Sequence, residues 1–447
     1  MYTSLVRFLS SAYDKFTERS LSYCRNILER TQWIEKEELE KLQMRKLKAL
    51  LRHAYENVPY YHRILRNNGF RPTDFNRLED MQKIPILKRS SLRLKPEELL
   101  TQNLGKGQLV ACATSGTTAT PLRFYLRKAE IPWHVAAELR GYGWGGYRPG
   151  DKYVHVRRVR PGDVLTRPLQ RLNRLVLRCK LLNTLNLSEK TLGSFSLTLQ
   201  KFKPDYVLGA AGSTNILATF LLQNGTRRIR PRGVFTYGQQ LLPHYRRAIE
   251  KAFNCRVYDC YGSTEVPQIA SQCGSHKGHH VADENVLVEI EKDGEAAAPG
   301  EEGKVLITSL NGYATPFIRY DIGDTGRILR DECSCGRKLS LFSPIGREYE
   351  YFVHSDGTFT FFRDVQTVFE DLPIKDFQIV QQRYDEILIK IVPKQGYKQV
   401  HTDFILKNIN LRIAEIANVR VELVDSLAFT GFGKLRHFFS KIQTKYT

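Results

Sequence analysis

Residues 114–121 read Thr-Ser-Gly-Thr-Thr-Ala-Thr-Pro and concentrate small and hydroxyl-bearing side chains in one short stretch. The apolar run 109–113 before it and the apolar-aromatic run 122–125 after it are typical of strands. Small residues let backbone N–H groups approach phosphate oxygens, and hydroxyl groups add further donors. The sequence therefore predicts a polyanion-binding loop between two strands, formed by Thr114, Ser115, Gly116, Thr117 and Thr118. A Ser/Thr-rich hairpin turn is the alternative interpretation.

A second group of reactive residue types, Tyr261-Gly262-Ser263-Thr264-Glu265, directly follows an expected strand at 255–260. The glycine allows a sharp turn, and an aromatic ring beside it can stack on a base. A carboxylate at the end of the turn can hold Mg²⁺ near phosphates. An ordinary turn at a strand end is the alternative.

Cysteines and histidines form a third group. Cys273-Gly274-Ser275-His276 is followed, far along the chain, by Cys333-Ser334-Cys335-Gly336. Three thiolates and one imidazole make a closed tetrahedral zinc site, and paired short spacings with a distant partner are typical of such sites. Spacing alone favours His276 as the fourth ligand. Reduced cysteines at the surface, without a metal, are the alternative.

The elements that must position these groups are those of an α/β protein. Expected strands at 206–208, 233–238 and 255–260 alternate with expected helices at 213–222, which Ser213 would cap, and 242–253. This alternation predicts a mostly parallel sheet whose ligand loops lie at the carboxyl ends of the strands. Segments 285–290 and 303–308 are expected to form a β-hairpin.

Two further regions flank this sheet. A helical pattern runs from 35 to 61, with Leu47, Leu50, Leu51 and Ala54 on one face. After residue 346 the pattern changes to a small α+β unit. Its expected strands lie at 349–353, 376–381, 386–392 and 419–423, with helices at 364–369 and 403–417. We expect a large domain at 1–346, with an N-terminal helical cap to about residue 105, and a small mobile C-terminal domain at 347–447.

The first two motifs resemble those of the adenylate-forming enzymes, the acyl-CoA synthetase and ligase superfamily. Residues 114–121 are similar to its phosphate loop, with Ala119 in place of a glycine, and 261–265 to its Tyr-Gly-x-Thr-Glu motif. Arg319-Tyr320-Asp321-Ile322-Gly323-Asp324 resembles its Arg-Tyr-x-x-Gly-Asp motif. Gly346-Arg347 resembles the hinge motif, and 431–436 the closing Gly-Lys motif.

The resemblance covers nearly the whole chain and is greatest to the phenylacetate–CoA ligase and CapK-like capsule-biosynthesis branch. Asn57-Val58-Pro59-Tyr60-Tyr61 and Ile84-Pro85-Ile86-Leu87-Lys88 match segments that recur at the N-terminus of that branch. Similar ligases carry a zinc site whose histidine lies nearer His280. The resemblance therefore favours His280 where spacing favours His276.

The resemblance also implies roles for single residues. Tyr261 would pack on adenine, Thr264 would approach the α-phosphate, and Glu265 would bind Mg²⁺. Asp324 would accept hydrogen bonds from both ribose hydroxyls, which a carboxylate can do at once. Lys434 would be the catalytic lysine, although alone it is one more cation in a basic tail. The other nucleotide-binding positions would be Tyr237, Gly238, Gly262 and Arg347 with the 114–118 loop.

The implied reaction is the ATP-dependent activation of a small-molecule carboxylic acid to acyl-AMP, with release of pyrophosphate. Transfer of the acyl group to a thiol, most simply CoA, would follow. One alternative is transfer to a sugar or amine in cell-surface polysaccharide assembly, without CoA. Another is a catalytically degenerate ligase fold that binds nucleotide as a scaffold.

Charge and composition limit the other classes. The 447 residues carry 68 basic against 47 acidic side chains, a net charge of +21, which favours polyanionic partners. Arginines and leucines interleave within 152–180, which predicts either a solvated basic face or peripheral contact with an anionic membrane. No helix-turn-helix, RNP or zinc-finger pattern supports nucleic-acid binding. With no apolar run long enough to span a bilayer and no secretory pattern, we expect a cytoplasmic protein. Any peripheral contact would be with the inner face of the membrane.

Overall fold

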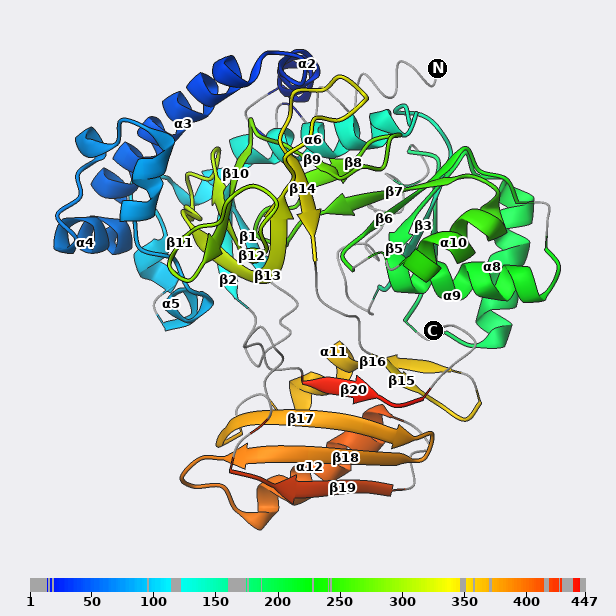
Figure 1. Ribbon diagram of the computed structural model, residues 1–447. Helices are drawn as coiled ribbons and strands as arrows, with labels where there is room; N and C mark the ends of the chain where they lie inside the picture. Colours follow the sequence, from blue (N-terminus) through cyan, green and yellow to red (C-terminus); the bar gives the residue numbers. More distant parts are fainter. Residues whose placement is uncertain are drawn as a thin grey trace.

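The computed structural model contains two separate sheet-based bodies (Figure 1). It describes residues 14, 17, 20–94, 96–113, 122–159, 174, 177–185, 187–226, 229–239, 241, 243–345, 351–356, 358–369, 372–413, 418–425, 427 and 437–442. The larger body is built on a twelve-stranded sheet and the smaller on a four-stranded sheet. Strands and helices alternate through the middle of the chain, so the predicted α/β class is confirmed.

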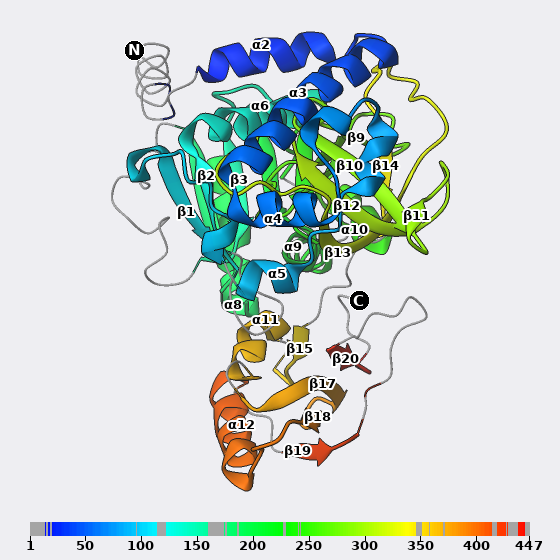
Figure 2. The same cartoon turned by 90° about the vertical axis from the view of Figure 1, so that its left-hand side faces the viewer.

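The N-terminal helices cover one side of the larger body (Figure 2). They are α2 (Leu21–Thr31), α3 (Lys36–Asn57), α4 (Pro59–Asn67) and α5 (Arg89–Leu94), with 3-10 turns after α4 and α5. The leucine face expected for α3 is buried in the core. The helical pattern expected over 35–61 is divided into two helices: α3 ends at Asn57, and Pro59 occupies the first position of α4. That position tolerates proline because its N–H has no helical partner.

The large sheet is parallel on one side and antiparallel on the other. In spatial order the parallel strands are β4 (Cys179–Asn183), β3 (Tyr153–Arg157), β5 (Tyr206–Ala210), β6 (Gly233–Tyr237) and β7 (Arg256–Tyr261). The antiparallel strands follow in the order β8 (Ala270–Gln272), β9 (His279–Val281), β14 (Leu341–Pro344), β13 (Tyr320–Ile328), β12 (Gly303–Ser309), β10 (Val286–Lys292) and β11 (Glu295–Ala296). The expected hairpin is the β10–β12 pair.

Helices cover both faces of the parallel strands. On one face, α8 (Glu189–Phe202), α9 (Ala211–Gln223) and α10 (Pro243–Phe253) pack on the valines of β3, β5, β6 and β7. On the opposite face, α6 (Ile131–Trp144) packs through Tyr142 against Phe235, Tyr258 and Cys260. Strands buried on both faces are expected for a parallel sheet.

Helix α9 begins at Ala211, before the Ser213 cap that the sequence suggested. The side chain of Gln239, which follows β6, accepts the backbone N–H of Gly212. A distant side chain thus satisfies a donor at the helix start that would otherwise have no partner, and Ser213 lies inside the first turn.

A two-stranded hairpin precedes α6. Strands β1 (Leu109–Ala113) and β2 (Arg123–Arg127) pair antiparallel, with Ala113 opposite Arg123. The strands predicted on either side of the hydroxyl-rich loop are therefore present.

A buried ion pair joins the N-terminal helices, α6 and the sheet. Arg140 of α6 makes two hydrogen bonds of 2.7 and 3.0 Å to the carboxylate of Glu284, and a third of 2.7 Å to the Leu28 carbonyl. The side chains of the pair are 1% and 0% exposed. Thr31 also donates to Glu284, so both oxygens of the buried carboxylate accept hydrogen bonds.

The smaller body is formed by the C-terminal segment. A hairpin of β15 (Tyr351–Val353) and β16 (Phe359–Phe361) leads into α11 (Phe362–Val365). The sheet that follows has the order β19 (Asn418–Leu423), β18 (Glu386–Pro393), β17 (Ile374–Arg383) and β20 (Phe438–Ser440). Helix α12 (Gln399–Arg412) covers it through Ile405 and Ile409. It begins and ends earlier than expected. At its start, Nδ1 of His401 accepts the backbone N–H of Lys398.

Among the described residues, none of the helices combines the length and hydropathy needed to cross a membrane. Most of the basic 152–180 segment, including 160–173, lies outside the described residues.

Candidate active site and metal site

Two glycine-dependent turns lie at the carboxyl ends of neighbouring parallel strands. Gly238, after β6, has a φ of +70°, which favours glycine. At Gly262, after β7, a Cβ atom would lie 2.0 Å from the Pro267 carbonyl oxygen, so no larger residue fits. Because β6 and β7 are adjacent, these turns bring Tyr237 and Tyr261 to the same edge of the sheet. Ligands of open α/β sheets bind at this edge.

Tyr261 contacts the acidic residue that the sequence assigned to ribose. Its hydroxyl donates a hydrogen bond of 2.9 Å to Oδ2 of Asp324, and its ring packs against Phe342 at 5.2 Å. Asp324 lies on β13, beyond β8, β9 and β14 in the sheet. This contact therefore joins the parallel part of the sheet to its antiparallel part. Gly323, with a φ of +77°, precedes Asp324 inside β13, where the register of the β12–β13 pair is irregular.

The turn after Gly262 holds Thr264 and Glu265 in different environments. The N–H of Val266 donates to Oγ of Ser263, and the N–H of Ser263 donates to the Val266 carbonyl. Thr264 is exposed at the tip, whereas Glu265 is only 5% exposed. The hydroxyl of the buried Tyr320 donates to Oε1 of Glu265 over 3.0 Å. A carboxylate suits Mg²⁺, and this bond fixes its orientation.

Several of the predicted site residues lie outside the described part of the chain. They are Thr114, Ser115, Gly116, Thr117, Thr118, Arg347 and Lys434.

Sequence reasoning assigned no role to Tyr320, and it placed Gln239 only in the segment 237–239, which the resemblance implies lines the acyl and adenine pockets. The available signal for Tyr320 was its position at the start of β13, four residues before Asp324 in the same motif. For Gln239 the signal was its place directly after Gly238. In neither case did the sequence identify the contacting partner.

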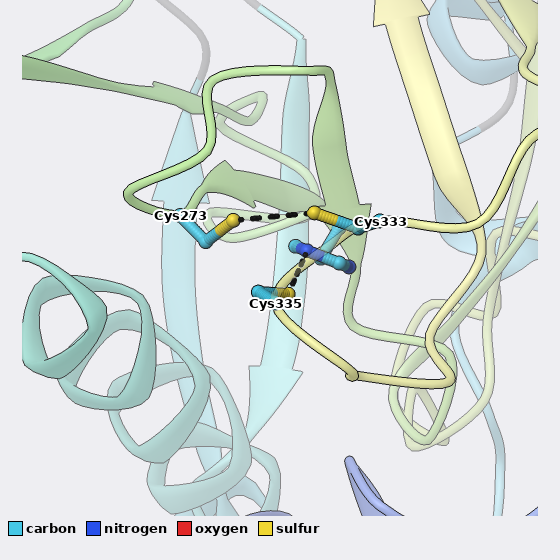
Figure 3. A group of neighbouring side chains, drawn as sticks. Cys273, Cys333 and Cys335 are labelled. Atoms are coloured by element: carbon cyan, nitrogen blue, oxygen red, sulfur yellow. Dashed lines mark hydrogen bonds between the residues drawn. The ribbon is translucent and has the colours of Figure 1, made fainter.

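Four ligand-type side chains converge beside β8, β9 and β14. One ligand atom each from Cys273, His280, Cys333 and Cys335 lies within 4.8 Å of all the others. The Cys273 and Cys333 sulfurs are 3.6 Å apart, and the Cys335 sulfur lies 3.2 Å from Nε2 of His280. Figure 3 shows the three cysteine side chains turned toward one place.

These distances fit a tetrahedral zinc ion. With Zn–S bonds of about 2.3 Å, two sulfurs of a tetrahedral site lie about 3.8 Å apart. Burial, and then the nearby Arg337 guanidinium, lower the pKa of His280 to about 4. The imidazole is therefore neutral at physiological pH, which is the form that binds metal. The Ser275 hydroxyl lies 2.7 Å from the Cys333 sulfur and 3.1 Å from that of Cys273, as an outer-shell partner would.

The structure decides between the two histidines that the sequence left open. His276, favoured by spacing, lies outside the four-atom group: its Nδ1 accepts from Arg246 at 3.4 Å, and its ring packs on Tyr258. His280 on β9 pairs with Leu341 of β14 and reaches Cys335 instead. Strand pairing, which spacing along the chain does not reveal, brings His280 and not His276 to the three cysteines.

Comparison with known families and proteins agrees with this architecture. Residues 352–441 match the CapK C-terminal domain. The phenylacetate–coenzyme A ligase of Thermus thermophilus is 23% identical over 382 residues, covering 80% of this chain and 82% of that protein. The Escherichia coli enzyme of the same name is 28% identical over 326 residues, or 69% and 71% of the two chains. Protein CapK of Staphylococcus aureus is 22% identical over 416 residues, or 91% and 90%.

Solved structures show the same fold. A 2-hydroxyisobutyryl-CoA ligase in complex with 2-HIB-AMP and CoA superposes with a TM-score of 0.68 at 20% identity, covering 92% of this chain and 91% of that one. An open conformation of that ligase gives a TM-score of 0.60 at 21% identity, covering 91% and 92%. Both sheet bodies therefore belong to one known architecture.

Proposed function

Because this chain belongs to the adenylate-forming ligase family, we propose that it uses ATP to convert a carboxylic acid to an acyl adenylate. Pyrophosphate is released, and the acyl group then passes to CoA. The observation that carries this proposal is the hydrogen bond between Tyr261 and Asp324. It brings two motifs of the chain together at the sheet edge where a nucleotide would bind.

In this proposal, the nucleotide contacts are those that the motif resemblance implies. Asp324 accepts the ribose hydroxyls, and Tyr261 packs on adenine beside Tyr237 and Gly238. Thr264, exposed at the tip of its turn, donates to the α-phosphate. Residues 114–118 and Arg347 bind phosphate and ribose oxygens.

The first step is an in-line displacement at the α-phosphorus. An oxygen of the acid's carboxylate forms the new P–O bond, and the bond to pyrophosphate breaks. The protein needs no nucleophile of its own, so its task is to position the reactants and neutralise charge. Glu265 would hold Mg²⁺, which supplies positive charge to the phosphates, and Lys434 supplies a further cation in the transition state.

In the second step the CoA sulfur attacks the acyl carbon and AMP leaves. A rotation of the small domain 347–447 about Gly346-Arg347 would exchange the groups that face the adenylate. Rotation of one domain about a short hinge is a common way to do this.

A second candidate concerns the acceptor alone. The chain matches the CapK C-terminal domain and is similar to protein CapK over 91% of its length. Because the sequence resembles the capsule-biosynthesis branch, the acceptor in this second candidate is a sugar or amine in cell-surface polysaccharide assembly. Consumption of the adenylate with CoA as the only acceptor would support the first candidate. An adenylate that is stable toward CoA would support the second.

We further propose that Cys273, His280, Cys333 and Cys335 hold a structural zinc ion. All four positions of a tetrahedral ion would be filled by protein atoms, so no position would be left for a substrate.

Acid-dependent exchange of pyrophosphate into ATP tests the first step. Exchange that requires one acid and Mg²⁺ is expected. The absence of exchange with every acid, in protein that binds ATP, would refute the proposal.

A further inference from the structure

The face of the parallel sheet under α6 is mostly aromatic but contains a carboxylate. Glu138, Tyr142 and Gly145 follow one another at helical spacing and turn toward this face. The Tyr142 ring lies 4.8 Å from that of Phe235, and a Cβ atom at Gly145 would come within 2.7 Å of the same ring. Glu138 therefore lies one turn along α6 from a tight aromatic contact.

Glu138 lies beside this aromatic group. The Tyr142 hydroxyl donates to its Oε1 over 2.6 Å. Because the Tyr142 ring packs against Phe235 of β6, the carboxylate lies on the same face of the parallel sheet as these aromatic rings.

A second polar pair marks the same face at the carboxyl ends of the strands. Nε2 of His155 on β3 lies 2.6 Å from the hydroxyl of Tyr237, the last residue of β6. Burial, and then Arg157, lower the pKa of His155 to about 3, so its ring is neutral. Tyr237 is also one of the residues that we expect beside the adenylate, which places this polar face next to the reacting group.

A carboxylate in such surroundings needs hydrogen-bond donors. Burial raises the pKa of Glu138, whereas the Tyr142 hydrogen bond and Arg157 lower it. Within the described part of the chain, Tyr142 is its only hydrogen-bond donor. An apolar ligand placed against Glu138 would desolvate its second carboxylate oxygen without donating a hydrogen bond to it, which is unfavourable.

The local charges select the kind of donor. Arg157 already supplies one positive charge to Glu138, and His155 is neutral. A neutral donor therefore completes the site, whereas an ammonium group would add a second cation.

On the basis of the proposed acid activation, we propose that the substrate is a hydroxylated carboxylic acid and that Glu138 accepts a hydrogen bond from its hydroxyl group. The aromatic side chains around Tyr142 and Phe235 would contact the apolar part of the acid. A site built to bind a substrate hydroxyl discriminates strongly against the analogue without it, because its own polar group then loses its partner.

The test compares matched acids in pyrophosphate exchange. The ring-hydroxylated phenylacetates are paired with phenylacetate and its ring-amino analogues, and the hydroxybutyrates with butyrate. For the wild type we expect kcat/KM to be at least about 100-fold higher for one hydroxylated acid than for its unsubstituted partner. In Glu138→Gln that ratio should fall at least about tenfold, because a charged acceptor is lost. Glu189→Gln, on α8 across the sheet, is the control and should keep the ratio.

Acid binding measured by calorimetry without ATP separates this inference from the proposed function. Tighter binding of the hydroxylated acid to the wild type, lost in Glu138→Gln, supports the inference even if no exchange occurs. Three results would overturn the inference: equal binding of both acids, tighter binding of the ring-amino phenylacetate, or an unchanged preference in Glu138→Gln. Thermal unfolding of Glu138→Gln establishes that the variant is folded.

Discussion

The hydroxyl of Tyr320 donates a hydrogen bond to Oε1 of Glu265, 55 positions away along the chain, over 3.0 Å. Both side chains are buried, at 0% and 5% exposure. The hydroxyl occupies one carboxylate oxygen and thereby orients the other. In metal sites such outer partners are nearly as important as the ligands themselves.

Tyr320→Phe should raise the Mg²⁺ concentration that adenylation requires, without unfolding the protein. We expect about a tenfold increase in the Mg²⁺ concentration needed for half-maximal exchange, because an unoriented carboxylate binds the ion less well. Titration of exchange against Mg²⁺ measures this. Tyr384→Phe, at an exposed tyrosine in the smaller body, is the matched control. Identical Mg²⁺ curves for the wild type and Tyr320→Phe would refute the positioning role.

The purified protein should contain about one zinc ion per chain, bound through the four-residue group. Cys333→Ser and His280→Ala should each lose the metal and lower the melting temperature, because metal binding adds to the free energy of unfolding. Elemental analysis and thermal unfolding provide the measurements.

His276→Ala is the control for this site, since its ring lies outside the group. It should retain zinc. Loss of zinc in His276→Ala with retention in His280→Ala would reverse the assignment.

Arg140→Met should destabilise the protein by about 3–5 kcal/mol, since it leaves the buried carboxylate of Glu284 without its charged partner. The double substitution Arg140→Met with Glu284→Met should cost less than the sum of the two single changes. Denaturant unfolding of the four proteins of this cycle measures the coupling. Strictly additive losses would show that the pair contributes no coupling energy.

The stability of the protein should depend on pH through Glu130. Burial raises the pKa of this carboxyl to about 8, although Oε1 accepts the N–H groups of Tyr313 and Ala314. The folded state therefore keeps a proton that the unfolded state releases above its ordinary pKa of 4.5. This contribution is complete below pH 4.5 and is lost as the pH rises through about 8.

Glu130→Gln keeps the acceptor oxygen but cannot ionise. Relative to the wild type, it should become progressively more stable as the pH rises from about 5 to about 9. Free energies of unfolding across this range measure the trend. A difference that is constant with pH would contradict the assignment.

Local sequence patterns predicted the elements whose periodicity is strong. The alternating residues of β17 and β18 and the leucine face of α3 were read directly, because side-chain burial alone decides them. Strand β20, three residues long and paired parallel to β17, was not predicted, since so short a run has no period of its own.

The contacts that build the candidate site depend on distant pairing. Spacing pointed to His276, but the pairing of β9 with β14 brings His280 to the cysteines. In the same way Gln239 determines where α9 begins, and Glu284 lies 144 positions from Arg140. These partners are chosen by the packing of the whole fold, about which a local pattern contains no information.

The most direct test of the account is the exchange of labelled pyrophosphate into ATP by the wild type, Glu265→Gln and Lys434→Ala, with the panel of acids described above. We predict exchange that depends on one class of acid and falls by about 10²–10³ in each variant, because each removes charge that stabilises the transition state. ATP binding without exchange for any acid would contradict acid activation and indicate a nucleotide-binding scaffold. If the wild type did not bind ATP, the proposed nucleotide site would be contradicted as well.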